Sequence, residues 1–152
     1  MVLSIEIPAN YGYVFFTVGI LPTVVNNFIL APMVMKARKT FKVGYPNLYA
    51  TPGFHKNADD FNRVQRGHQH VFENLSDFRT VSFIGGLGYP TICAVGGVVY
   101  CLGNVLYMLG YSDTKMDVKT ARLKKGGPLN MLALFVNLVC AVKFTISVVQ
   151  SK

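Results

Sequence analysis

Long runs of apolar residues dominate the chain and are separated by two polar connectors. Three runs are almost free of charge and long enough to cross a bilayer as helices: about 11–35, 91–109 and 129–149. The first would cover about 37 Å at roughly 1.5 Å per residue. This pattern predicts membrane-spanning helices and no soluble core.

A fourth apolar run, about 71–88, differs from the others because its first half carries Glu73 and Asp77. It leads directly into the third span through Gly88-Tyr89-Pro90, which predicts a tight turn. Because no globular insertion fits between these runs, we expect it to span as well. The predicted fold is therefore an all-α, integral membrane four-helix bundle in which 1–152 is a single domain.

The first run has two features that could argue against a span. Pro22 and Pro32 would break a soluble helix, but in a membrane neighbouring groups can re-satisfy the carbonyls that proline frees, so kinks are expected. A cleaved signal peptide is the alternative, yet MVLSIEIPANYG lacks a basic region and the apolar run is too long. A membrane helix is the preferred interpretation.

Composition supports a membrane protein, with 51% apolar residues, a mean hydropathy of +0.36 and a net charge of +8. The basic residues gather in the two connectors instead of forming a patch for nucleic acid, so no nucleic-acid partner is predicted. By the positive-inside rule the connectors face the cytosol, and both termini face the lumen or exterior. The residues that carry this bias are Lys36, Arg38, Lys39, Lys42, Lys56, Arg63, Arg66, Lys115, Lys119, Arg122, Lys124 and Lys125.

The three cysteines, Cys93, Cys101 and Cys140, fall within predicted spans and are odd in number. They predict neither a disulfide framework nor a metal site. The nucleotide-binding, metalloprotease and hydrolase motifs of soluble enzymes are also absent from the sequence.

A polar stripe enters the second span from a helix expected to begin near Asn57–Asp60. At 100° per residue its members fall within an arc of about 80°. They are Asn62, Arg66, His70, Glu73 and Asp77. Ion pairing within one helix is the ordinary explanation, but ionisable residues this deep usually face a bundle interior or a water-filled site, which favours function.

A second stripe on the third span has similar spacing but different chemistry. It consists of Tyr100, Asn104, Tyr107 and Tyr111. Ordinary packing and an interfacial aromatic belt would explain tyrosines here. The alternative is that the two stripes face one another.

Several segments together resemble the MAPEG family, the membrane-associated proteins of eicosanoid and glutathione metabolism. They are YGYVFF near the start, KARKTFKVGYPNLYA, FNRVQRGHQH followed by Glu73, and VLYMLGY. The resemblance covers nearly the whole chain. It implies a homotrimer of four-helix subunits in the endoplasmic reticulum, with glutathione bound between neighbouring subunits near the cytosolic face and no metal.

The resemblance also implies roles for individual residues in binding glutathione as co-substrate. Arg66 corresponds to a carboxylate-binding arginine, Glu73 to the acceptor of the glutathione amine, and Arg38 adds a cation; Tyr107 and Tyr111 match tyrosines that line the peptide. His70 and Asn104 stand where the family usually has Asn and Arg. A guanidinium suits carboxylates and a carboxylate suits an ammonium, so the first stripe has the required charges.

Two residues after the third span, Lys119 and Arg122, both qualify as the cation that activates the glutathione thiol. Arg122 is preferred because a guanidinium stays charged in a half-dry site. The implied function is a transferase or glutathione-dependent peroxidase acting on lipophilic electrophiles or lipid hydroperoxides from the membrane. The alternatives are a non-catalytic lipid-binding or scaffold protein of the same family, and a small channel.

Overall fold

The computed structural model describes residues 4–151, and this part of the chain is built of helices without a strand. Five segments run end to end as one continuous helix from Gly12 to Phe41: α1 (Gly12–Val14), η1 (Phe15–Ile20), α2 (Leu21–Val25), η2 (Asn26–Leu30) and α3 (Ala31–Phe41). The other elements are α4 (Ala58–Glu73), α5 (Leu75–Gly88), α6 (Pro90–Tyr111), α7 (Val118–Lys124) and α8 (Leu129–Gln150).

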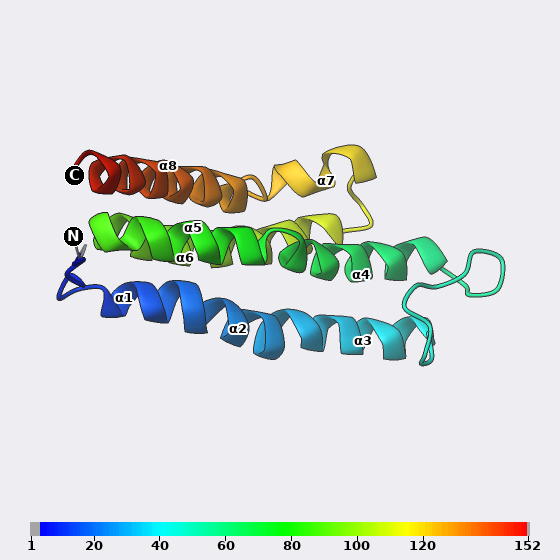
Figure 1. Cartoon of the computed structure of the whole chain (residues 1–152). Helices are drawn as coiled ribbons and strands as arrows, with labels where there is room; N and C mark the ends of the chain where they lie inside the picture. Colours follow the sequence, from blue (N-terminus) through cyan, green and yellow to red (C-terminus); the bar gives the residue numbers. More distant parts are fainter. Residues whose placement is uncertain (1–3, 152) are drawn as a thin grey trace.

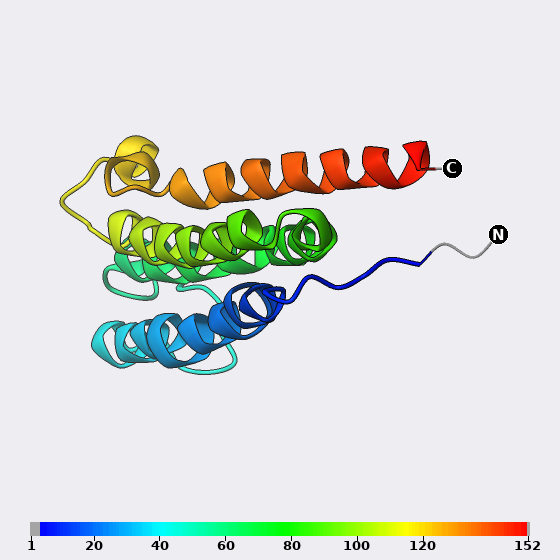
Figure 2. The same ribbon diagram turned by 90° about the vertical axis from the view of Figure 1, so that its left-hand side faces the viewer.

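The long helical stretches lie side by side in three layers (Figure 1). The composite helix α1–α3 forms one outer layer, α4, α5 and α6 form the middle, and α8 forms the other outer layer against α5 and α6. Figure 2 shows the same order and places both termini at one end. Both connectors, with the short α7, lie at the opposite end, as the distribution of basic residues predicts.

Within residues 4–151, three helices are long and apolar enough to cross a membrane: Gly12–Phe41, Pro90–Tyr111 and Leu129–Gln150. These match three of the four expected spans. The fourth, about 71–88, is not one helix, because the backbone leaves the helical conformation at Asn74, with φ −118° and ψ 5°. Residues 71–73 belong to α4 and the apolar part to α5, so a crossing by α5 stays a prediction.

The two prolines of the first span lie within the continuous helix, as expected. A wider π-helical segment, η1 or η2, precedes each of them. Proline has no N–H, so main-chain carbonyls in the turn before it lose their helical partner. Near Pro22, the guanidinium of Arg79 on α5 donates to the carbonyl of Gly19 at 3.0 Å and to that of Val18 at 3.4 Å. Arg79 of the neighbouring helix thus supplies donors to two carbonyls of the turn before Pro22, including that of Val18, which would otherwise accept from residue 22.

The core between the layers is dominated by aromatic and small side chains. Phe78 of α5 and Tyr100 of α6 stack with ring centroids 3.8 Å apart, and both side chains are fully or almost fully buried. Tyr100 therefore packs as a core residue, the ordinary explanation for that tyrosine. The same cluster contains Val14 and Val18 of the first helix.

Candidate functional site

A cavity of about 310 Å³ opens at the connector end of the molecule, between α4, α6, α7 and the start of α8. Its volume is at the lower end of the range of small-molecule sites. The lining combines two cations, one carboxylate, two ring systems and a few apolar groups. The residues are Arg66, His70, Glu73, Tyr107, Arg122, Leu123, Gly127, Pro128, Asn130 and Met131.

Arg66 and Glu73 form an ion pair inside this cavity, with Nη1 and Oε1 2.5 Å apart. The hydrogen bond to Glu73 raises the pKa of Arg66. Both side chains are about two-fifths exposed, at 39% and 44%, so their attraction is screened and adds little to stability. The pair instead presents one positive and one negative group to whatever enters the cavity.

His70 connects this ion pair to the interior. Its Nδ1 lies 3.1 Å from Glu73 Oε2, its Nε2 lies 3.0 Å from Asn130 Nδ2, and its ring stacks on Tyr107 at 3.8 Å between centroids. Asn130 Oδ1 accepts from the main-chain N–H of Met131 at 2.7 Å, which identifies Nδ2 as the donor. Nε2 of His70 therefore accepts, and the neutral ring carries its proton on Nδ1, facing Glu73.

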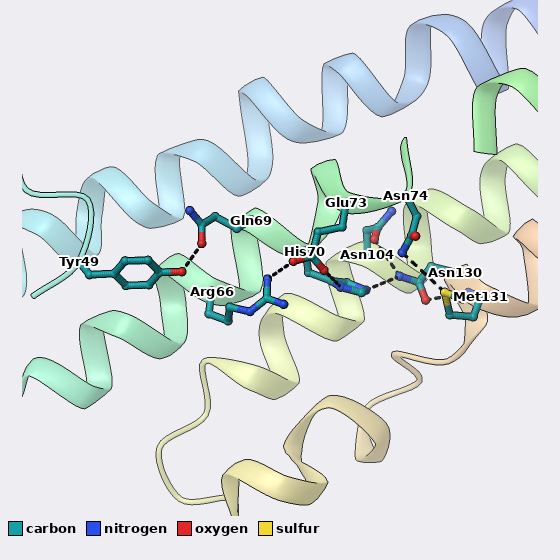
Figure 3. A network of polar contacts seen from close by, with 9 residues as sticks. All are labelled: Tyr49, Arg66, Gln69, His70, Glu73, Asn74, Asn104, Asn130 and Met131. Atoms are coloured by element: carbon teal, nitrogen blue, oxygen red, sulfur yellow. Dashed lines mark hydrogen bonds and ion pairs between the residues drawn. The ribbon is translucent and has the colours of Figure 1, made fainter. Parts of the chain in front are cut away.

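The chain of contacts continues into the core. Asn130 Nδ2 also donates to Asn104 Oδ1 at 3.0 Å, and both asparagines are 2% exposed. Figure 3 shows the resulting line from Arg66 through Glu73 and His70 to Asn130 and Asn104. The two predicted stripes therefore face one another, with Asn130 of α8 between them.

The cation Arg122 reaches the cavity from α7. This helix is capped at its start by Asp117, whose Oδ1 accepts from the N–H of Lys119 at 3.0 Å. Its middle lies so close to α6 that a Cβ on Gly110 would be 2.6 Å from the carbonyl oxygen of Ala121. The position of α7 therefore determines where the Arg122 guanidinium lies.

A second cavity, of about 350 Å³, adjoins the first and shares Arg66 with it. Tyr111, Asn62 and Tyr49 belong to its lining. The rings of Tyr107 and Tyr111 stack at 5.8 Å between centroids, so a continuous aromatic wall leads from one cavity to the other. The two cavities offer an elongated ligand a polar path on both sides of Arg66.

The MAPEG family model matches residues 16–143. The chain belongs to the MAPEG family. The match includes both connectors and every residue of the two cavities, so the family assignment and the cavity geometry concern the same part of the chain.

In this MAPEG chain, five of the eight predicted site residues line the first cavity together: Arg66, His70, Glu73, Tyr107 and Arg122. Tyr111 lines the second cavity. Arg38 and Lys119 line neither. Whether the eight bind or activate glutathione stays a prediction.

Arg38 is engaged elsewhere in the subunit. Its Nη1 donates to the carbonyl of Asn47 at 2.8 Å and to that of Val43 at 3.4 Å, and the guanidinium lies over the rings of Tyr45 and Phe61. These contacts fold the first connector back toward α4. They explain the arginine without a ligand.

Asp77 belongs to the predicted polar stripe but does not line the cavity with the other ionisable members. The predicted stripe assumes one continuous helix, but the break at Asn74 separates Asp77 from Glu73. Asp77 accepts a hydrogen bond from its neighbour Ser76 and is exposed. The polar stripe therefore ends at Glu73.

Asn130 is not among the site residues that the sequence predicts, because a single Asn in an apolar run carries no periodic signal. Arg63 is predicted only as one of the basic residues of the connector side. A signal for Asn130 does exist: Asn137 follows it by seven residues on α8, and Gly96 and Gly103 have the same spacing on α6. Small residues that allow close approach, and polar residues that hydrogen-bond across helices, are typical of helix contacts in membranes.

Proposed function

We propose that the protein is a membrane-bound glutathione transferase and glutathione-dependent peroxidase for lipophilic electrophiles or lipid hydroperoxides. Within the family, its segments most resemble type 3 microsomal glutathione transferases. The observation that carries the proposal is that one cavity contains the Arg66–Glu73 pair together with Arg122. Glutathione needs a cation for its carboxylates, a carboxylate for its ammonium and a cation near sulfur, and this cavity offers all three.

The chemistry rests on ionising the glutathione thiol beside Arg122. Lowering a thiol pKa from about 8.5 to about 6.5 requires about 2.7 kcal/mol and raises the thiolate at pH 7 from roughly 3% to roughly 76%. One guanidinium in a partly dry cavity is sufficient for that effect. Attack on an electrophilic carbon forms a thioether. Attack on a peroxide oxygen releases an alcohol and leaves a sulfenic acid, which a second glutathione converts to disulfide and water.

The proposal extends to assembly and location. The subunit crosses the endoplasmic reticulum membrane four times, assembles as a homotrimer and opens its cavity toward the cytosol, from which glutathione enters. Lipophilic substrates arrive from the membrane lipid, and no metal takes part. Arg38 contacts glutathione only if its side chain leaves the connector carbonyls, so of the proposed contacts this one requires the largest rearrangement.

Binding of glutathione is the first test. Titration calorimetry of the detergent-solubilised protein is expected to show saturable binding, weakened by roughly 1 to 3 kcal/mol in Arg66→Ala and in Glu73→Gln because each loses a charge-assisted hydrogen bond. Lys39→Ala, which removes an exposed cation of α3 outside both cavities, is the matched control. Absence of binding to the unaltered protein would favour the lipid-binding or scaffold alternative.

Activation of the thiol is the second test. Ultraviolet titration of the bound thiolate is expected to give a higher thiol pKa in Arg122→Ala, because the lost cation stabilises only the ionised sulfur. Lys119→Ala should leave that pKa unchanged. A shift in Lys119→Ala alone would assign activation to the lysine, and no shift in either variant would contradict the enzyme.

A further inference from the structure

Arg63 is a buried cation whose side-chain hydrogen bonds, within residues 4–151, all go to main-chain oxygens at the end of α6 and in the connector that follows it. Its guanidinium also lies 5.9 Å from the centroid of the Tyr111 ring. Arg63 lies on α4, is 9% exposed, and belongs to none of the three ion pairs found among residues 4–151. Its Nε donates to the carbonyl of Tyr111 at 2.7 Å, Nη2 to that of Asp113 at 2.7 Å, and Nη1 to that of Met116 at 3.0 Å. A buried charge requires such partners, and these three occupy three nitrogens of one rigid fork.

These carbonyls define the path of the chain between α6 and α7. Tyr111 is the last residue of α6, where the negative end of the helix dipole favours a cation. Met116 immediately precedes Asp117, the cap of α7. Arg63 therefore joins the end of one helix to the start of the next and determines the point at which α7 begins.

Two further contacts hold α7 in place. Lys125 Nζ lies 3.1 Å from Asp113 Oδ2, which ties the end of α7 back to the residue whose carbonyl Arg63 binds. Ala121 is fully buried against Gly110 of α6. With both ends and the middle attached, the face of α7 that carries Arg122 and Leu123 is held at the cavity.

We propose that Arg63 is a positioning residue for Arg122, acting through the carbonyls of Tyr111, Asp113 and Met116 and through the start of α7. The inference rests on the proposed function, in which Arg122 stabilises the glutathione thiolate. Arg63 lines the second cavity with Arg66 but does not line the first, which contains Arg122, so its effect on a sulfur beside Arg122 is exerted through the position of α7.

The variant Arg63→Lys separates geometry from charge. It keeps the positive charge, and thus the field at the cavity, but a single ammonium cannot reproduce a fork that reaches three separate carbonyls. We expect the pKa of the bound glutathione thiol to rise by about one unit, which is about tenfold less thiolate where the thiol is mostly protonated. The affinity for S-methylglutathione, which has no ionisable thiol, should change less than about threefold, an effect below 1 kcal/mol.

Arg79→Lys is the matched control. Arg79 is likewise a guanidinium that donates to main-chain carbonyls, those of Val18 and Gly19, but it belongs to α5 and lines neither cavity. This variant tests whether loss of an arginine fork disturbs the site by general destabilisation. The bound thiol pKa should be the same in Arg79→Lys and the unaltered protein; an equal rise in both lysine variants would overturn the inference.

The result with Arg122→Ala distinguishes a failure of the inference from a failure of the proposed function. If Arg122→Ala raises the thiol pKa and a folded Arg63→Lys does not, Arg63 has no positioning role and the enzyme proposal stands. If Arg122→Ala has no effect, the inference falls, and the enzyme proposal falls with it unless Lys119→Ala raises the thiol pKa. Should Arg63→Lys not fold, Asp113→Asn tests the premise that the position of α7 sets the thiol pKa, because it breaks the ion pair with Lys125. The lost negative charge by itself would lower the thiol pKa, so a rise supports the inference and any other result contradicts it.

Discussion

Two buried asparagines of α8 occupy equivalent positions in the packing of this protein but have different surroundings. Asn130 and Asn137 are seven residues apart and are 2% and 0% exposed. Each lies against a glycine of α6: a Cβ on Gly103 would be 2.3 Å from the main-chain nitrogen of Asn130, and one on Gly96 would be 2.3 Å from Asn137 Oδ1. The same unit of close helix contact is thus used twice.

The difference lies in what each asparagine meets on its other side. Asn130 meets His70, and through it Glu73 and the cavity. Asn137 Nδ2 donates to Ser82 Oγ at 2.7 Å and to the carbonyl of Cys93 at 3.3 Å, and within residues 4–151 its Oδ1 has no hydrogen-bond partner. One packing unit therefore supports a charged site while the other only joins three helices, which shows that buried polarity alone does not identify a site.

The largest expected effect comes from filling the two glycine positions. Gly103→Ala should lower the free energy of unfolding by about 3 kcal/mol, because its Cβ meets main chain that cannot rotate away, and Gly96→Ala by about 2 kcal/mol, because it meets a side chain. Thermal unfolding in detergent measures both. Equal losses would mean that Asn137 is held as rigidly as the backbone at Asn130.

Truncating the asparagines should separate stability from binding. Asn130→Ala leaves Asn104 buried without its partner and frees His70, so we expect about 2 kcal/mol less stability and glutathione binding weaker by about 1 kcal/mol. Asn137→Ala should cost about 1 kcal/mol of stability and leave binding unchanged. Parallel calorimetry checks this, and weaker binding by Asn137→Ala would abolish the distinction between the two positions.

Substitutions of His70 test whether its hydrogen bonds connect Asn130 to the cavity. His70→Phe keeps the stacking on Tyr107 but removes both hydrogen bonds, so glutathione binding should weaken by about 1 kcal/mol. His70→Asn, with the residue usual in the family, can still donate toward Glu73 and should bind within about threefold of the unaltered protein. Equal binding by the Phe variant would show that the hydrogen bonds of His70 do not orient Glu73.

The smallest expected effect is a pH dependence of stability that comes from His68 of α4, near the end of the molecule that carries the connectors. Burial lowers the pKa of His68 from 6.5, and its Nε2 contacts Asn26 Oδ1 at 3.0 Å. The folded state disfavours the charged ring. The contribution of neutral His68 to the free energy of unfolding is therefore fully present above about pH 6.5, the unfolded pKa, and is lost as the pH falls from that value to the lower folded pKa.

His68→Gln should therefore flatten the fall of the melting temperature between about pH 7 and 5.5, the range in which a histidine titrates. Asn137→Ala is the control, since none of its hydrogen-bond partners titrates in that range. An unchanged slope in His68→Gln would place the pH dependence in another group.

The sequence by itself determined the features that repeat along one chain segment. Apolar runs of bilayer length gave the three candidate spans, and the placement of basic residues predicted that both connectors lie at the end opposite the termini. Periodicity likewise placed Arg66, His70 and Glu73 on one face of a helix, and the family resemblance singled out Tyr107 and Arg122. Hydrophobic period and charge are local properties, so they can be read without knowing which helices meet.

Only the tertiary structure decided how these pieces come together. The break at Asn74 removed Asp77 from the stripe, because a 100° projection assumes an unbroken helix. Arg38 donates to carbonyls of its own connector and lines neither cavity. Asn130 contacts His70 of the first cavity, and Arg63 binds the connector that precedes α7, although no pattern in the sequence predicted a role at the site for either residue. Contacts between side chains and distant main-chain oxygens depend on the packing of several helices at once, and no local pattern in the sequence records that packing.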